Sequence, residues 1–136
     1  MTTLQDVSIL IVDTEHKTAP TQESGIPSIR TPNVGRGRLK LHGVRRISEK
    51  TYQEWSRRAV PQANDIIIAR EAPVGNVALI LPGQRVCLGQ RTVLVRPNPE
   101  FVNPAFLCYW MLGHKVQAHF EAVSTGATTP LSLIHI

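Results

Sequence analysis

The stretch ANDIIIAREAPVGNVALI, residues 63–80, decides the fold. It holds two short runs of aliphatic and β-branched residues, 65–69 and 76–81, and the link between them carries proline and glycine turn signals. Two such runs joined by a short turn predict a β-hairpin, with Arg70 and Glu71 in its tip. The middle of the chain is therefore expected to form a sheet of short, tightly spaced strands.

Further strands are expected on both sides of this hairpin. They are predicted at residues 7–12, 26–30, 85–88 and 92–96. The first run, VSILIV, is apolar throughout and predicts a buried strand. The Thr31-Pro32-Asn33 step should end the second, because proline cannot donate to a sheet ladder. The expected sheet is curved and mainly antiparallel.

A short helix is predicted in the middle of the chain. Ser48 is a suitable N-cap for a helix from Glu49 to about Arg58, on which Tyr52 and Trp55 share one face. An aromatic pair at helical spacing usually packs into a core, although exposed rings can also stack on nucleic-acid bases. We expect the helix to pack through its aromatics.

A second helix is predicted near the C-terminus. Asn103 followed by Pro104 is a helix start, with a capping side chain and then proline in the first turn. The run FLCYWML, residues 106–112, is apolar nearly all round and predicts a core helix, which Gly113 can bend or end. Together the elements predict an α+β fold.

Length and composition fit one domain, residues 1–136. Hydrophobic residues make up 42% and charged residues 18%, as in ordinary globular proteins. The apolar runs are too short to cross a bilayer and no targeting segment is visible, so a soluble, cytoplasmic protein is expected. Cys87 and Cys108 are expected to be buried free thiols. The histidines show no metal-ligand spacing, and neither a metal nor a cofactor is predicted.

Positive charge is concentrated in one segment. The formal charge is −3 for residues 1–27, +7 for residues 28–58 and +1 for the remainder. Most of the cations in the middle segment are arginines, whose planar fork suits phosphate oxygens and guanine edges. An anionic polymer is one interpretation, and a solvated face that keeps the protein soluble is the other. Composition alone supports them equally.

No catalytic constellation is visible in the sequence. It has no Walker loop, no G-x-S-x-G motif and no glycine-rich dinucleotide or methyl-donor fingerprint. Asp65 and Glu71, six apart around the first hairpin strand, could be imagined as a nuclease carboxylate pair. A strand-end cap for Asp65 and a rim charge for Glu71 are the favoured roles.

The chain resembles one target recognition domain of a type I restriction-modification specificity subunit. The resemblance covers roughly residues 7–133 and rests on the order and spacing of six blocks. These blocks are IPSIRTPNV (26–34), RIS with Tyr52 and Trp55 downstream, ANDIIIAREAPVGNVALI (63–80), CLGQRTVLVRP (87–97), FLCYWML (106–112) and STGATTPLSL (124–133). Each block is weak alone, and the argument depends on their succession.

The resemblance implies a function. Specificity subunits bind double-stranded DNA and are not catalytic, and each of their two recognition domains reads half of a split target through the major groove. Methylation belongs to the methyltransferase (modification) subunits, and cleavage to the restriction/translocase subunit that joins through them. The chain is thus expected to bind DNA sequence-specifically, with no catalytic residues of its own.

The resemblance also implies which residues meet DNA. Those on the basic side are Arg30, Thr31, Asn33, Arg36, Arg38, Lys40, Arg45 and Arg46. Those of the hairpin tip, the neighbouring turn and the closing loop are Arg70, Glu71, Gln90, Arg91, Thr125 and Thr128. The basic segment would form one wall of a cleft, and the hairpin tip with Gln90 and Arg91 would form the other.

A structural role is the alternative for each of these residues. Arg45 and Arg46 can pair with Glu49, and Arg70 can pair with Glu71. Gln90 and Arg91 can order the sheet, and the threonines of the closing loop can form a turn.

The chain also departs from the family pattern. A full specificity subunit has two recognition domains separated by long helices that dock the methyltransferase subunits, whereas one domain and no such helix are found here. A fragment of a longer subunit is therefore expected. Alternative functions are a fragment of a fused restriction-methylation enzyme, a small metal-dependent nuclease, or a protein-interaction domain whose basic face meets an acidic partner.

Overall fold

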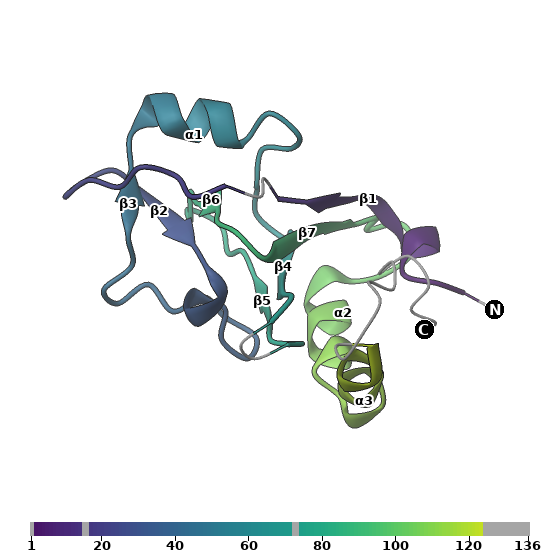
Figure 1. Cartoon of the computed structure of the whole chain (residues 1–136). Helices are drawn as coiled ribbons and strands as arrows, with labels where there is room; N and C mark the ends of the chain where they lie inside the picture. Colours follow the sequence, from purple (N-terminus) through teal and green to yellow (C-terminus); the bar gives the residue numbers. More distant parts are fainter. Residues whose placement is uncertain (1, 15–16, 72–73, 124–136) are drawn as a thin grey trace.

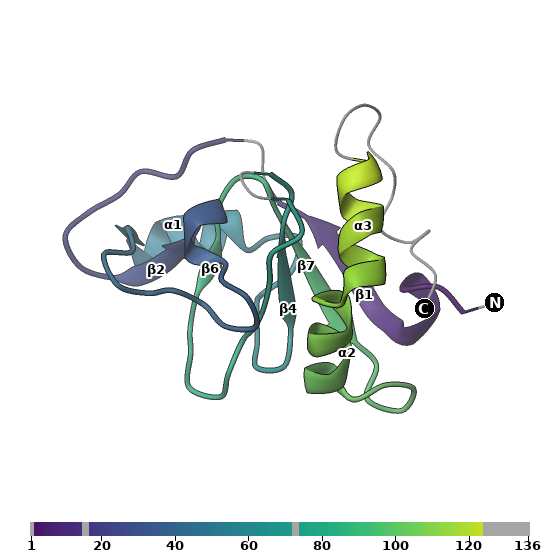
Figure 2. The same cartoon turned by 90° about the horizontal axis from the view of Figure 1, so that it is seen from below.

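Four layers of secondary structure make up the computed structural model, which describes residues 2–14, 17–71 and 74–123. Two β-sheets face one another in the middle. Helix α1 (Glu49–Trp55) covers the outer face of one sheet, and helices α2 (Pro104–Met111) and α3 (His114–Val123) cover the outer face of the other (Figures 1 and 2). The mixed α and β content and the mainly antiparallel pairing confirm the predicted fold class.

The larger sheet contains the predicted hairpin. Its four strands lie in the order β1-β7-β4-β5, and all neighbours are antiparallel. The bounds are Ser8–Asp13 for β1, Thr92–Pro97 for β7, Ile66–Ala69 for β4 and Val77–Leu79 for β5. Strands β4 and β5 form the hairpin that residues 63–80 predict, so that prediction is confirmed.

Strand β4 is apolar without alternation because both of its faces are covered. Ile66 and Ile68 pack toward α2 and α3, whereas Ile67 and Ala69 pack toward the second sheet. All four residues are buried. Buried on both sides, such a strand carries aliphatic residues at every position rather than at every second one.

Strand β1 differs from its prediction. It was expected to be fully buried, but it lies at the edge of the larger sheet, after a 3₁₀ turn, η1 (Gln5–Val7). Five of its six residues are half-buried, and the sixth, Ile9, is 58% exposed. An apolar run identifies a strand but does not reveal whether both faces of that strand will be covered.

The smaller sheet was not expected as a separate unit. It has the order β3-β2-β6, with β2 (Ile26–Ile29) antiparallel to β3 (Arg46–Ile47) and parallel to β6 (Cys87–Leu88). Residues 85–88 were assigned to one run of strands with residues 92–96, but β6 and β7 lie in different sheets. The break after β2 is confirmed, and Thr31–Asn33 form the 3₁₀ turn η2.

Helix α1 packs as predicted but is shorter. The Ser48 hydroxyl accepts a hydrogen bond from the Thr51 backbone N–H at 3.1 Å, which confirms the N-cap. Tyr52 is buried between α1 and the smaller sheet. The helix ends at Trp55, not near Arg58. Arg58 therefore lies beyond the helix, and its side chain donates a hydrogen bond to the Asp13 carbonyl at 2.9 Å.

The predicted C-terminal helix ends close to Gly113, one of the two outcomes expected of that residue, and α3 follows it. The Asn103 side chain accepts from the Phe106 N–H at 3.0 Å, which confirms the helix start, and Gly113 separates α2 from α3. Helix α2 is not a core helix on all sides. Leu107, Cys108 and Met111 are buried, whereas Phe106 is 62% and Tyr109 is 74% exposed.

Both cysteines are buried free thiols, as predicted. Burial raises the pKa of Cys87 and of Cys108 to about 11. Within residues 2–14, 17–71 and 74–123, no group of His, Cys, Asp and Glu is arranged to hold a metal ion. No helix in this part of the chain has the length and apolar character needed to cross a membrane.

Candidate nucleic-acid interface

Strands of both sheets end at one common edge of the molecule. Asp13, the last residue of β1, lies opposite Val93, and Ala69, the last residue of β4, lies opposite Thr92. In the smaller sheet, β2 and β6 run parallel and also end together. The strand-end edge, as we call it, comprises Asp13, Arg30, Arg70, Glu71, Gln90 and Arg91. Most of these residues were predicted to meet DNA.

Backbone hydrogen bonds join the segments of this edge directly. The Gly89 N–H donates to the Ile29 carbonyl at 2.6 Å, and the Arg70 N–H donates to the Arg91 carbonyl at 2.9 Å. Arg30, at the end of β2, therefore lies against the turn that carries Arg91. Arg30, from the basic set predicted to meet DNA, thus lies at the same edge as Arg70, Glu71, Gln90 and Arg91.

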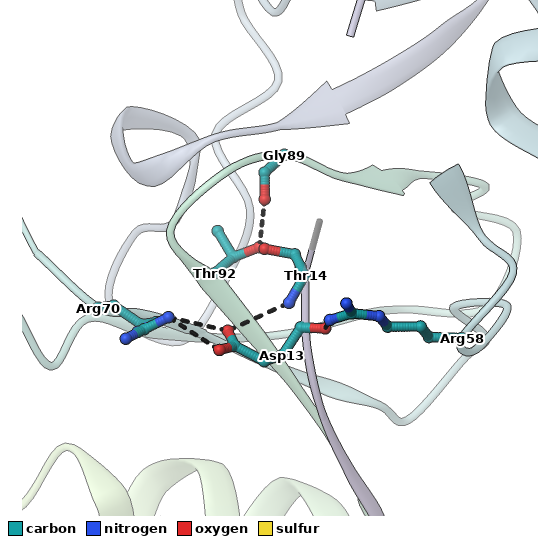
Figure 3. A network of polar contacts seen from close by, with 6 residues as sticks. All are labelled: Asp13, Thr14, Arg58, Arg70, Gly89 and Thr92. Carbon is teal, nitrogen blue, oxygen red and sulfur yellow. Dashed lines mark hydrogen bonds and ion pairs between the residues drawn. The ribbon is translucent and has the colours of Figure 1, made fainter. Parts of the chain in front are cut away.

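Arg70 and Glu71, in the hairpin tip, each form an ion pair, but not with each other. Arg70 pairs with Asp13 at 2.9 Å, and Arg91 pairs with Glu71 at 2.8 Å. The alternative that Arg70 pairs with Glu71 is thus wrong. The Asp13 carboxylate also accepts from the Thr14 N–H at 3.1 Å, and Figure 3 shows it between Thr14 and Arg70.

Gln90 faces inward toward the 17–18 backbone. In the amide orientation that satisfies both of its polar groups, its oxygen accepts from the N–H groups of Lys17 and Thr18 at 3.3 and 3.2 Å. The Lys17 ammonium in turn lies 4.4 Å from the centre of the Trp55 ring. These contacts support the ordering role that was the alternative for Gln90.

The loop that carries Arg36, Arg38 and Lys40 is fixed to the larger sheet. The Gly37 N–H donates to the Val77 carbonyl at 2.7 Å, and the Gly37 carbonyl accepts from the Leu79 N–H at 3.2 Å. The three basic side chains are exposed. Among the described residues none of the three makes an ion pair, and Arg36 reaches only the Leu112 carbonyl, at 3.4 Å. Within the part of the chain that the structure describes, this loop therefore presents three exposed cations that have no acidic partner, and its backbone is joined to β5.

Asn33 has a role inside this loop. It is buried, its side-chain oxygen accepts from the Arg30 N–H, and its amide nitrogen donates to the Lys40 carbonyl, both at 3.1 Å. Asn33 was predicted to lie near DNA, and in the structure its side chain orders the loop from within. Thr31, two residues earlier, is half-buried.

Arg45 and Arg46 lie at β3, away from the strand-end edge. Arg46 lies opposite Pro27, near the start of β2, and donates to the Gly25 carbonyl at 2.9 Å. The expected partner Glu49 is held instead by two hydrogen bonds from Arg85, at 2.5 and 2.8 Å. These bonds lower the pKa of the Glu49 carboxyl and raise that of Arg85.

The structure does not bring the candidate nuclease carboxylates together. Asp65 precedes β4 and Glu71 follows it, so about 20 Å of extended chain separates them. Asp65 is 1% exposed and accepts two hydrogen bonds from Arg96, each of 2.9 Å. It also accepts from the Gln62 N–H, which confirms its predicted role as a strand-end cap.

Sequence reasoning missed Asp13 and Arg58. Asp13 lies in the acidic N-terminal segment and contacts Arg70 across 57 residues of chain. Its position directly after an apolar strand was the one available signal. Two predicted residues, Thr125 and Thr128, lie outside the described residues.

The chain is similar to type I specificity subunits in sequence and in fold. It is 24% identical over 89 residues to the type I restriction enzyme EcoBI specificity subunit of Escherichia coli, covering 65% of this chain and 19% of that subunit. No model of a protein family matches the chain.

Two solved structures share the fold. The first, from a study of complex assembly and conformational transition of the type I R-M system, has a TM-score of 0.67 and 16% identity, covering 99% of this chain and 32% of that one. The second, the HsdS subunit from Thermoanaerobacter tengcongensis, has a TM-score of 0.64 and 21% identity, covering 98% and 31%. The resemblance inferred from the sequence is confirmed, and this chain spans about a third of the solved chains.

Proposed function

We propose that this chain binds duplex DNA sequence-specifically and gives a type I restriction-modification complex its choice of a target half-site. Methylation and cleavage would belong to partner subunits, the methyltransferase (modification) and restriction/translocase subunits. The similarity to specificity subunits supports this role. The separation of Asp65 from Glu71 weighs against the metal-dependent nuclease.

The observation that carries the proposal is the pairing of two kinds of surface. The loop with Arg36, Arg38 and Lys40 offers exposed cations that are suited to phosphate. It lies beside the start of β5, where the Asn76 amide donates to the Val34 carbonyl at 3.2 Å. The strand-end edge nearby offers arginine and carboxylate groups, which are suited to base edges. Phosphate contacts would position the domain and the edge would read sequence.

A salt titration tests the proposal. Fluorescence anisotropy of the 136-residue chain with a labelled duplex library should give an affinity that falls linearly with salt on a log-log plot. Each of Arg36→Ala, Arg38→Ala and Lys40→Ala should reduce the slope by about 0.9, the value for one phosphate contact.

Lys50→Ala is the matched control, because Lys50 is an exposed cation on α1, in a different layer. It should leave the slope unchanged. A slope of zero for the unaltered chain, or equal effects at all four positions, would argue against DNA binding through this loop.

A further inference from the structure

Arg70 stands at the strand-end edge in a restricted position. Its backbone N–H is bonded to the Arg91 carbonyl, so the start of the side chain is fixed by the turn that follows β6. The side chain is 30% exposed, less than that of Arg91 at 65%. Arg70 therefore has fewer available rotamers than an ordinary surface arginine and is suited to a defined contact.

The Asp13 carboxylate is itself held in place. Asp13 ends β1 and lies opposite Val93, so its backbone belongs to the larger sheet. Its carbonyl accepts from Arg58 Nη1 at 2.9 Å, and one of its carboxylate oxygens accepts from the Thr14 N–H. Figure 3 shows these contacts converging on Asp13 from the ends of β1 and β4 and from the segment after α1. These contacts hold the Asp13 carboxylate in one place, so it can orient a guanidinium that binds to it.

Only one nitrogen of Arg70 is engaged by Asp13. Both carboxylate oxygens accept from Nη1, at 2.9 and 3.0 Å. Among the described residues, nothing accepts a hydrogen bond from Nε or Nη2 of Arg70, and Figure 3 shows a single guanidinium nitrogen joined by dashed lines to the Asp13 carboxylate. Nε and Nη2 form a planar two-donor fork, which matches the O6 and N7 acceptors of guanine.

From this geometry we infer that Arg70 reads a guanine edge and that Asp13 is the positioning residue that orients its fork. The inference rests on the proposed DNA binding and assigns one base contact within it. Asp13 fixes the direction of the donors and neutralises part of the charge of Arg70, so that Arg70 contributes more to sequence preference than to general attraction for phosphate.

Selection from a library of randomised duplexes tests the inference. The 136-residue chain and its variants are allowed to bind the library, and the bound DNA is sequenced. Arg70→Ala and Arg70→Lys should each lower the preference for guanine at one position of the selected motif by about fivefold or more. Asp13→Ala should lower the preference at the same position, and Asp13→Asn, which keeps one acceptor, should have a smaller effect.

Glu49→Gln is the matched control, because it removes an exposed carboxylate from a different arginine, Arg85. It should leave every position of the motif unchanged. Thermal unfolding of each variant establishes that it is folded. If Asp13 only stabilises the fold, Asp13→Ala will lower the melting temperature and the affinity for all sequences alike, which overturns the inference.

The selection experiment distinguishes failure of the proposed DNA binding from failure of the roles assigned to Arg70 and Asp13. If the unaltered chain enriches no motif, the proposed function is overturned and the inference with it. If it enriches a motif whose positions all survive Arg70→Ala and Asp13→Ala, only the assignment of Arg70 and Asp13 is overturned.

Discussion

At the scale of single residues, the contrast between buried and exposed ion pairs has a measurable consequence. The Asp65 side chain is 1% exposed and its partner Arg96 18%. Arg96→Met would leave a buried carboxylate without its guanidinium, and we expect the free energy of unfolding to fall by about 3–5 kcal/mol. Urea unfolding followed by circular dichroism measures the change.

Arg85→Met is the control for this substitution, because the side chains of Arg85 and Glu49 are 56% and 55% exposed. Exposed pairs contribute little, so the expected loss is at most about 1 kcal/mol. Similar losses for the two variants would show that burial does not set the contribution of the Asp65–Arg96 pair.

Residue roles were predictable from the sequence where they depend on neighbours in the chain. The Ser48 and Asn103 caps and the Asp65 strand-end role are confirmed, because each side chain bonds a backbone N–H only three residues away. Partners across the fold were not predictable. Asp13 could not be connected to Arg70, nor Arg85 to Glu49, before the strands were placed.

At the scale of elements, the turn from β6 to β7 connects the two sheets, and Gly89 is its critical residue. A Cβ at Gly89 would lie 2.7 Å from the Ile29 carbonyl oxygen and 2.8 Å from Arg30 Cγ. Gly89→Ala should therefore push β2 away from the turn and lower the free energy of unfolding by about 1–3 kcal/mol. Chemical denaturation measures it, and an alanine variant as stable as the parent would contradict the close approach.

The sequence predicted the pairing of strands that are neighbours in the chain, but not the pairing of strands that are far apart in it. The hairpin of β4 and β5 is local, and its turn signals were sufficient. The sequence did not predict that β6 and β7 lie in different sheets, because β6 pairs with β2, which is far away in the chain. Only tertiary packing decides such a pairing, and a two-residue strand carries almost no pattern of its own.

At the scale of the whole molecule, the two thiols lie in cores on opposite sides of the sheets, and both should limit stability in alkali. The pKa of each is about 11 in the folded chain, against an ordinary value of 9.0. Below about pH 9 both states carry the proton, and above it the unfolded chain loses the proton first. The free energy of unfolding should thus decrease between about pH 9 and 11, by at most about 1.4 kcal/mol per pH unit and thiol.

Urea unfolding at a series of pH values measures this decrease. Cys87→Ala and Cys108→Ala should each flatten the pH dependence in this range, whatever their effect on stability at neutral pH. Unchanged slopes in both variants would mean that other groups cause the alkaline loss.

The strand-end edge draws its side chains from separate segments, each fixed to a strand of its own. The apolar residues that hold those strands lie behind the edge and take no part in it. Under the proposed function, mutation of one segment would alter one base preference while the remaining contacts and the core persist. Natural selection could then change the target of such a domain in single steps, with every intermediate still folded and still bound to DNA.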